Sequence, residues 1–346
     1  MSMNVLAPSG RWSLPALALS VILAGGAATS LVRHHDDGLP AGVAFQIGAR
    51  DVTVGELDQR INTLTALYSL KKPTDPAALE TFRRDAAKSM AVSIILAGEA
   101  ANLDIVVSAA DAQSGLDRVI QQSLGGDTSK FTKFLGDSGI SQDDVLAEVS
   151  RTLATSQLYS SVTKDVVAPT DAEARADYDS HRADMVSPEQ RTLSNIVVAT
   201  KAEAQRILAR LRGGESFTAL ARSSSLDSST RDKGGDLGTH AAADMDAAYA
   251  KVAFAARKGA VFGPVSTGAN AWNVGRVDAV VPSKQLTFEQ VRATLVNALK
   301  SREQLKVWNA WLSRVIKKAG VVYADKYRPA HPDEAPSLDQ QQGTTP

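Results

Sequence analysis

The stretch GGDLG at residues 234–238 decides the fold of this chain, together with the residues that follow it. Met245 and Tyr249 come next along the sequence. The tripeptide GPV at residues 263–265 then leads into an apolar segment that begins at Trp272. A glycine cluster of this kind is weak evidence by itself, so the information lies in the order of these features and in the segments around them.

The segments around the glycine cluster follow strand and helix patterns. An apolar-ended strand pattern covers residues 191–198, and a helical face follows it and ends at Gly213-Gly214. After the cluster we expect a helix over residues 245–255 and closing strands, the last over residues 272–280. The apolar residues that define the two helices before the cluster are Ala204, Ile207, Leu208 and Leu211 in the first and Phe217, Leu220 and Ala221 in the second. The pattern predicts a small α+β sheet domain over residues 188–282, about 95 residues long, which is a size that folds independently.

In this order and context, the motif resembles the parvulin (PpiC-type) family of peptidyl-prolyl cis/trans isomerases. Met245 lies seven residues past the last glycine of the cluster and Tyr249 four residues later, and Phe254 follows before the GPV tripeptide. The resemblance covers about a quarter of the chain. It implies a shallow apolar pocket that receives a substrate proline, with substrate-binding walls formed by Leu237, Met245, Tyr249 and Phe254. Ordinary core packing is the alternative for these four residues.

The chemistry that the resemblance implies needs no cofactor and no metal. Rotation about an X–Pro peptide bond faces a barrier of about 20 kcal/mol because twisting breaks amide resonance. An apolar pocket that holds the proline ring and favours the twisted, less polar amide directs binding energy to the transition state. The resemblance therefore predicts an enzyme, a peptidyl-prolyl cis/trans isomerase that forms no covalent intermediate.

Three polar residues occupy positions that the resemblance marks as catalytic. Parvulins usually carry histidines at two of them, where this chain has Asn195 and Asn273. Asparagine donates and accepts hydrogen bonds, but it does not change charge near neutral pH as imidazole does. Asp227 matches a position where family members carry Cys or Asp, and its implied role is to shape the electric field around the twisting carbonyl. An exposed loop aspartate is the alternative for Asp227.

Two other residues near the motif receive no role from the sequence. The segment from Thr267 to Asn273 is one residue longer than the usual family spacing, which argues against Thr267 as an active-site hydroxyl. His240 is able in principle to replace a lost imidazole, but a solvated loop position is the simpler interpretation.

The region before this domain, residues 43–185, is predicted to be mostly helical. It opens with FQIGARDVTVGEL at residues 45–57, a short strand pattern that leads into a helix, and further helical patterns follow. Ser141 is placed as the N-cap of one helix, and Thr170 opens a capping box for another. A short strand, several helices and then a parvulin-like domain is a layout that resembles the N-terminal chaperone region of SurA-type and PrsA-type foldases.

A long helix is expected after the parvulin-like domain, over residues 286–320, with a capping pattern at Thr287. This helix carries Trp308 and Trp311, and its apolar stripe must be buried. The helical block of residues 43–185 is its natural partner, as the resemblance also implies. The predicted fold class is therefore α+β, with a mostly helical chaperone-like domain and a small parvulin-like domain. Residues 325–346 are rich in Pro, Asp, Gln and Thr and are expected to be disordered.

The N-terminal segment, residues 1–36, is expected to carry a targeting signal, with a buried core helix as the alternative. Residues 14–32 are uncharged and mostly apolar, and as a helix they would span about 28 Å, which is close to the thickness of a bilayer core. A retained transmembrane anchor is one interpretation. The alternative is a cleaved signal peptide with residues 26–28 as the small-residue cleavage site. Both place the rest of the chain outside the cytoplasmic membrane.

Length and composition exclude several classes of protein. With 346 residues the chain is long for a single core, so two or more domains are expected. Its formal net charge of zero gives no electrostatic footprint for nucleic acid. The absence of cysteine rules out disulfides, thiol catalysis, zinc–thiolate sites and a lipid-modified N-terminal cysteine.

The sequence leaves three hypotheses for function. The first is an extracytoplasmic peptidyl-prolyl isomerase and foldase that acts on unfolded secreted or envelope proteins containing X–Pro bonds. The second is a membrane-tethered holdase whose parvulin-like domain binds unfolded polypeptide without catalysis. The third, a purely structural envelope protein, explains the helical block but leaves the proline pocket without a purpose.

Overall fold

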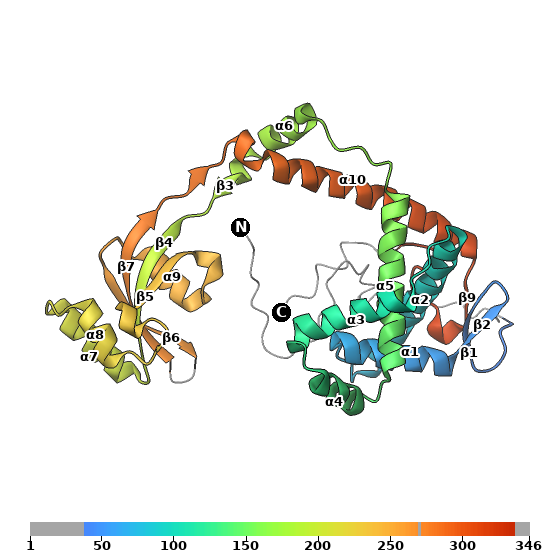
Figure 1. Cartoon of the computed structure of the whole chain (residues 1–346), viewed down its shortest axis with the longest axis horizontal. Helices are drawn as coiled ribbons and strands as arrows, with labels where there is room; N and C mark the ends of the chain where they lie inside the picture. Colours follow the sequence, from blue (N-terminus) through green and yellow to red (C-terminus); the bar gives the residue numbers. More distant parts are fainter. Residues whose placement is uncertain (1–37, 269–270, 336–346) are drawn as a thin grey trace. The chain divides into compact units, whose positions relative to one another are not determined.

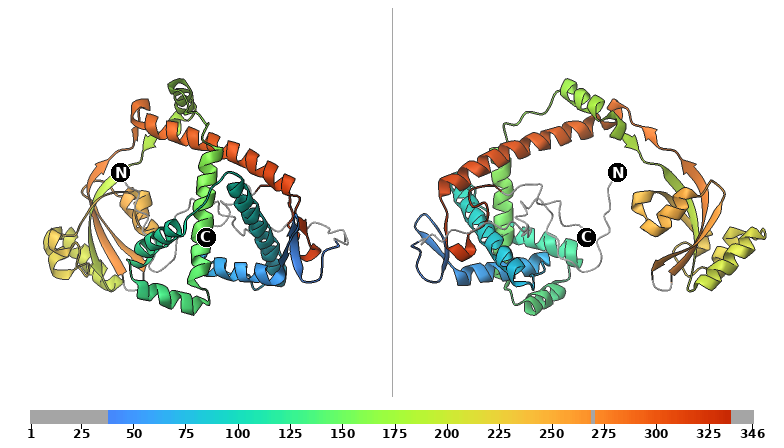
Figure 2. Two further views of the ribbon diagram at one scale, coloured as in Figure 1. Left: turned by 45° about the vertical axis from the view of Figure 1, so that its right-hand side comes forward. Right: turned by 180° about the vertical axis from the view of Figure 1, so that it is seen from behind.

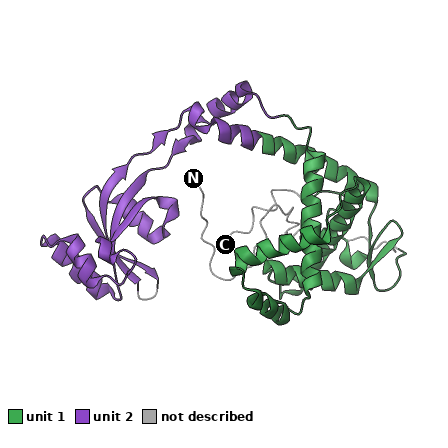
Figure 3. Cartoon of the chain, viewed as in Figure 1, with its two compact units in different colours: residues 1–167, 300–346 green, residues 168–299 purple. Residues whose placement is uncertain are grey.

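The computed structural model describes residues 38–268 and 271–335. The expected anchor or signal segment, residues 1–36, lies outside the described residues. None of the described helices has the length and hydrophobicity that crossing a bilayer requires. The chain divides into two compact units (Figure 3): unit 1 comprises residues 1–167 and 300–346, and unit 2 comprises residues 168–299.

Unit 1 begins with a small antiparallel sheet in the strand order β2-β1-β9 (Figure 1). Its strands are β1 (Val43–Ile47), β2 (Arg50–Thr53) and β9 (Val322–Tyr323). The last residue of β2, Thr53, is also the N-cap of the first helix and forms a capping box with Glu56. The sheet therefore passes directly into the helical part of the unit.

Helices make up most of unit 1, and they begin where the sequence provides a capping side chain. They are α1 (Val54–Tyr68), α2 (Pro76–Asn102), α3 (Ala109–Leu124), α4 (Thr128–Ser138), α5 (Gln142–Val162) and the part of α10 (Phe288–Ala319) that follows Leu299. Asp75, Ser108, Asp127 and Ser141 each accept a hydrogen bond from a backbone N–H in the next turn. The prediction of Ser141 as an N-cap is confirmed.

The second half of α10 lies in the core of unit 1. Trp308 is fully buried there, in a cluster that includes Leu158 of α5 and Val92 of α2. Its ring lies 5.4 Å from the ring of Tyr159 and 5.0 Å from that of Trp311, centroid to centroid. The stripe that contains the two tryptophans is therefore buried against the helical block, as the sequence predicts.

Of the residues expected to be disordered, 325–346, the structure describes those up to 335, and the first of these pack into unit 1. A short 3₁₀ turn covers Asp325–Tyr327, and Tyr327 is buried in the same cluster as Phe45. Tyr323 packs on Phe45 with a ring-centroid distance of 5.6 Å. Tyr323 and Tyr327 explain the difference. Each buries a large apolar surface, although the average composition of the segment is polar.

Unit 2 is built around a four-stranded antiparallel sheet in the order β5-β4-β7-β6. Its strands are β4 (Gln190–Val198), β5 (Asp236–Ala241), β6 (Val261–Gly268) and β7 (Ala271–Val281). Figure 2 shows helices α7 (Lys201–Arg212) and α8 (Phe217–Ser224) on one side of the sheet and α9 (Ala247–Ala255) on the other. This is the small α+β domain that the sequence predicts.

Alternation along the central strands separates the two faces of this sheet. Ile196 and Val198 of β4 pack with α7 and α8, whereas Leu193 packs with α9. Successive side chains of a strand point to opposite faces, so Asn195 shares the α9 face with Leu193. The candidate polar residue of β4 is thereby placed under α9 and away from the larger apolar cluster.

The remaining elements of unit 2 flank the sheet domain. They are α6 (Asp171–Ser180), a short 3₁₀ turn (Arg182–Asp184), the strand pair β3 (Val186–Ser187) and β8 (Lys284–Gln285), and the first turns of α10. Thr170 and Glu173 form the predicted capping box of α6. Tyr178 packs edge-on against Phe288 at 5.9 Å, and its hydroxyl donates to the Leu286 carbonyl at 2.6 Å.

Candidate active site

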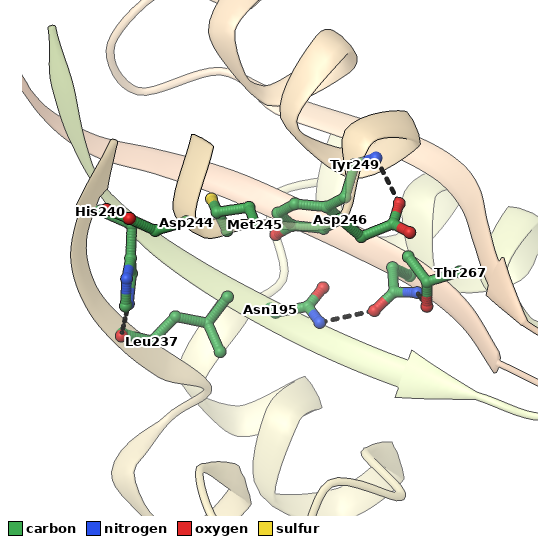
Figure 4. Close-up of a pocket in the computed structure, with 9 residues that line it drawn as sticks. Asn195, Leu237, His240, Asp244, Met245, Asp246, Tyr249 and Thr267 are labelled. Atoms are coloured by element: carbon green, nitrogen blue, oxygen red, sulfur yellow. Dashed lines mark hydrogen bonds between the residues drawn. The ribbon is translucent and has the colours of Figure 1, made fainter. Parts of the chain in front are cut away.

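A pocket of about 240 Å³ opens on the α9 face of the unit 2 sheet (Figure 4). Each strand of the sheet contributes to it, as do α9 and the connection between β5 and α9. Its lining residues are Asn195, Leu237, His240, Asp244, Met245, Asp246, Tyr249, Thr267 and Asn273. Five of the residues singled out in the sequence are brought together here: Asn195, Asn273, Leu237, Met245 and Tyr249.

A pair of buried amides forms the floor of the pocket. Asn195 of β4 and Asn273 of β7 are 6% and 4% exposed, and Asn195 Nδ2 donates to Asn273 Oδ1 at 2.7 Å. Asn273 Nδ2 donates to the Val265 carbonyl at 3.3 Å and to Thr267 Oγ1 at 2.8 Å. A backbone carbonyl only accepts, so these contacts fix the orientation of the Asn273 amide. Asn195 must then turn its nitrogen toward Asn273.

The orientation of the pair leaves one buried acceptor unused. Asn195 Oδ1 has no hydrogen-bond partner among the described residues. Figure 4 shows this oxygen on the side of the amide away from the dashed bond to Asn273. A buried polar atom without a hydrogen-bond partner is costly. The floor of the pocket therefore holds an acceptor, the Asn195 oxygen, that a donor on a bound ligand would stabilise.

Two motif glycines bring the chain close to this amide pair. Gly235, from the GGDLG stretch, has φ of +85°, and a Cβ there would lie 2.3 Å from the carbonyl oxygen of Asn195. Gly263, from the GPV tripeptide, has φ of +117°, and a Cβ there would lie 2.6 Å from the carbonyl oxygen of Asn273. Only glycine fits either position. The glycines of the motif therefore allow the chain to pack closely against the strands that carry Asn195 and Asn273.

The apolar wall of the pocket centres on Tyr249. Its ring packs edge-on against Phe262, with centroids 5.3 Å apart, and Leu237 and Met245 pack in the same cluster. Tyr249 is 3% exposed and its hydroxyl has no partner among the described residues. Burial raises the pKa of the Tyr249 phenol, and the Asp278 carboxylate adds to this effect, so the group is neutral at physiological pH.

Two aspartates at the rim of the pocket were missed in the sequence. Asp246 is the N-cap of α9, where its Oδ1 accepts from the backbone N–H of Tyr249 at 3.0 Å. Asp244 Oδ2 accepts from the backbone N–H of Ala241 at 3.2 Å. Both carboxylates are exposed at the pocket. The only signal for them was local, an Asp three residues before a helical position, which the prediction of a helix starting at Met245 obscured.

His240 and Thr267 also line the pocket, although the sequence assigned them no role. His240 Nε2 lies 2.6 Å from the Leu237 carbonyl, which only accepts, so this nitrogen carries the proton and braces the wall residue. Thr267 Oγ1 accepts from Asn273, and its own hydroxyl proton is free to point elsewhere. The irregular β6–β7 register between Ser266 and Gly268 accommodates the longer segment that argued against Thr267.

Two predicted site residues are not among those that line the pocket, Asp227 and Phe254. Asp227 Oδ1 accepts from Ser229 Oγ at 2.5 Å, and Oδ2 accepts from the hydroxyl of Thr230. Burial acts to raise the pKa of Asp227, but these hydrogen bonds outweigh it and lower the pKa. Phe254 packs in the α9 cluster, with the guanidinium of Arg191 5.0 Å from its ring centroid.

The pocket offers an apolar surface and groups that form hydrogen bonds. Within the described residues, no group of three or more His, Asp or Glu side chains is arranged to hold a metal ion. The site consists of an apolar wall, a neutral amide floor and an acidic rim. Such a site holds an apolar ring and hydrogen-bonds the peptide groups around it.

Comparison with known proteins places this site in a recognised domain. Residues 169–293 match the PPIC-type PPIASE domain family. The foldase protein PrsA of Clostridium kluyveri is 23% identical over 277 residues, which are 75% of this chain and 81% of that protein. The PrsA of Caldanaerobacter subterraneus subsp. tengcongensis is 29% identical over 174 residues, 50% of this chain and 54% of that protein. A solved structure from a pair of SurA-like chaperones of Campylobacter jejuni has 24% identity and a TM-score of 0.37, and it covers 61% of this chain and 85% of that one.

Proposed function

We propose that this chain is a peptidyl-prolyl cis/trans isomerase and foldase, whose PPIC-type PPIASE domain isomerises X–Pro bonds in unfolded polypeptides. The observation that carries the proposal is that the pocket lies within the matched domain. The domain matched at residues 169–293 contains a pocket whose wall is made of the apolar residues that the family motif marks, namely Leu237, Met245 and Tyr249.

The wall and the floor divide the work of catalysis. The substrate proline ring packs against Met245 and Tyr249, which fixes one side of the X–Pro bond while the other side rotates. Twisting removes amide resonance and makes the bond less polar, so an apolar surface stabilises the twisted state relative to the planar one. No covalent step is needed.

The polar floor orients the peptide groups beside the proline. Asn195 Oδ1 is a free acceptor for a substrate N–H, and the hydroxyl proton of Thr267 is free for a substrate carbonyl. These contacts hold the part of the substrate backbone that does not rotate. Fixing it in advance lowers the entropic cost of reaching the transition state. Asn195, Asn273 and Thr267 are therefore the proposed polar site residues. Asp227 does not line the pocket, and its proposed role is that of a negative charge acting from a distance. Its hydrogen bonds to Ser229 and Thr230 fix its position in the loop after α8.

For the whole chain, we propose a foldase that works outside the cytoplasmic membrane on unfolded secreted or envelope proteins. The support is the similarity to PrsA foldases over most of the chain. Unit 1 would hold the unfolded client while unit 2 isomerises its prolines. Residues 14–32 would either retain the protein at the membrane or be removed on export, in which case the protein is secreted.

A second candidate is a holdase without catalysis. The observation that favours it is the amide pair itself, because two neutral asparagines bound to each other supply no group that changes charge near neutral pH. On this hypothesis the pocket binds proline-containing segments and releases them unchanged.

One experiment separates the two candidates. Cis/trans exchange of a proline peptide is measured with the purified chain, and suppression of client aggregation is measured in parallel. Isomerisation that Tyr249→Ala abolishes, with Tyr159→Ala of unit 1 as the matched control that keeps it, supports the isomerase. Aggregation suppression without any measurable isomerisation leaves the holdase.

A further inference from the structure

The rim of the proline pocket carries two carboxylates, those of Asp244 and Asp246. Asp244 and Asp246 are exposed there, and the nine lining residues include no lysine and no arginine. Across residues 38–268 and 271–335, neither carboxylate forms an ion pair. The charge of the rim is therefore available to a ligand.

Local structure fixes both carboxylates in place. One oxygen of Asp246 accepts from the Tyr249 N–H at 3.0 Å, and one oxygen of Asp244 accepts from the Ala241 N–H at 3.2 Å. Each capping bond uses a single oxygen, so the second oxygen of each group remains able to accept. Figure 4 shows Met245, a residue of the proline wall, between the two aspartates.

An independent observation inside the pocket also calls for a donor. Asn195 is 94% buried and its Oδ1 has no partner within the described chain, and the buried Tyr249 hydroxyl has none either. Proline has no N–H, so the ring alone does not satisfy the Asn195 oxygen. The residues on either side of the proline are the part of a bound substrate that can supply a donor to the Asn195 oxygen.

We propose that the pocket selects X–Pro segments that carry lysine or arginine next to the proline, with Asp244 and Asp246 as the specificity-determining residues. Lysine and arginine are the side chains that donate several hydrogen bonds, accept none and bring the opposite charge. The inference rests on the proposed function for the presence of proline in the pocket. The preference for a basic neighbour rests on the rim.

The expected preference is modest because the rim is exposed. An exposed ion pair changes an equilibrium by up to about fivefold, and two carboxylates acting on one cation raise the ratio to roughly tenfold at low salt. At 1 M salt the screening length shrinks to about 3 Å, so the preference falls toward unity. A preference set by shape alone does not depend on salt.

The test uses the full chain and a series of short proline peptides. Lysine, arginine, leucine or glutamate is placed before the proline in one set and after it in the other. Isomerisation rate and peptide affinity are both measured for each. The variant is Asp244→Asn with Asp246→Asn, which removes the charge while asparagine retains an oxygen for each backbone cap. Asp232→Asn is the matched control, because Asp232 is exposed in the same unit and does not line the pocket.

We expect basic peptides of at least one set to bind and react several-fold better than leucine peptides and glutamate peptides to be worst. The double variant abolishes this order and the control keeps it. If basic peptides bind preferentially but no peptide is isomerised, the inference stands and the proposed catalysis fails. Isomerisation without any charge preference, or a preference that survives in the double variant, overturns the inference and leaves the catalysis intact.

Discussion

Asn195 and Asn273 are 78 positions apart in the sequence and share one hydrogen bond at the base of the pocket. In the parvulin pattern these positions carry imidazoles, which gain and lose a proton near neutral pH. Amides keep the donor and acceptor roles and lose the titration. The chain thus retains hydrogen-bonding groups at these two positions, in an amide pair whose charge does not depend on pH.

This difference predicts how the rate responds to pH. The Asn195–Asn273 pair does not titrate, so we expect it to add no pH dependence to the isomerisation rate between about pH 5.5 and 8. The double variant Asn195→His, Asn273→His introduces a pH dependence in that range, because buried imidazoles charge as the pH falls. The measurement is a pH–rate profile of both proteins in the His240→Gln background, which removes the other imidazole of the pocket. A double variant with the profile of its parent contradicts the expectation.

Tyr249 separates the contribution of a ring from that of a hydroxyl. Its hydroxyl is buried, neutral and without a described partner, so Tyr249→Phe is expected to leave the free energy of unfolding unchanged or to raise it by about 1 kcal/mol. Tyr249→Ala removes the ring and is expected to cost about 3 kcal/mol and most of the activity. Urea unfolding and peptide exchange measure the two effects. If Tyr249→Phe also loses its activity, the hydroxyl contacts the substrate and the wall is more than apolar.

At the scale of elements, the sheet accommodates the pocket through a glycine in β7. Gly275 lies opposite Asn195 in the β4–β7 register. A Cβ at Gly275 would lie 2.2 Å from a ring carbon of Phe262 and 2.6 Å from the Tyr249 hydroxyl. The absence of a side chain at this position is what allows both rings to pack on the sheet under α9.

Gly275→Ala is therefore expected to displace the apolar wall. Overpacking of this kind costs about 2 kcal/mol, and we expect weaker peptide binding because Tyr249 must move. The contact with the Tyr249 hydroxyl provides a compensating change, so Gly275→Ala combined with Tyr249→Phe should recover part of the loss. Unfolding midpoints of the single and double variants test this. If the two substitutions change the unfolding midpoint additively, the added methyl group of Gly275→Ala does not contact the Tyr249 hydroxyl.

The sequence indicated the elements more successfully than the rim of the site. Caps such as Ser141 and Thr170 are local signals, so helix starts followed from them. The resemblance to the family marked the positions of Asn195 and Asn273, and the structure shows their hydrogen bond to each other. Asp246 was missed because the apolar pattern from Met245 favoured a helix there, whereas α9 begins at Ala247 with Asp246 as its cap. Whether a capping side chain also borders a pocket depends on strands distant in sequence, which no local pattern contains.

At the scale of the whole molecule, the two units carry their charged groups differently. In unit 2, the carboxylates of Asp244 and Asp246 lie exposed at the pocket, whereas unit 1 buries one carboxylate between helices. Glu148 of α5 is 6% exposed and is bound by the guanidinium of Arg60, by Arg151 Nε at 3.0 Å and by the Tyr68 hydroxyl at 3.2 Å. Burial acts to raise the pKa of Glu148, but the two arginines outweigh it and hold the pKa below its ordinary value.

This cluster predicts that the stability of unit 1 can be changed without altering the active site. A carboxylate with a lowered pKa stabilises the fold above its ordinary pKa, and the contribution is lost as the pH falls through the lower, folded-state value. Glu148→Gln leaves Arg60 buried without its counter-ion and is expected to cost about 3 kcal/mol, the lower end for a broken buried pair because Arg151 stays partly solvated. We expect denaturant unfolding to show an earlier transition for unit 1 and a shallower acid dependence. Peptide isomerisation in unit 2 should be unchanged, while aggregation suppression falls under conditions that unfold unit 1. Loss of isomerisation in Glu148→Gln, with the pocket residues intact, would mean that the two activities are not separable by unit.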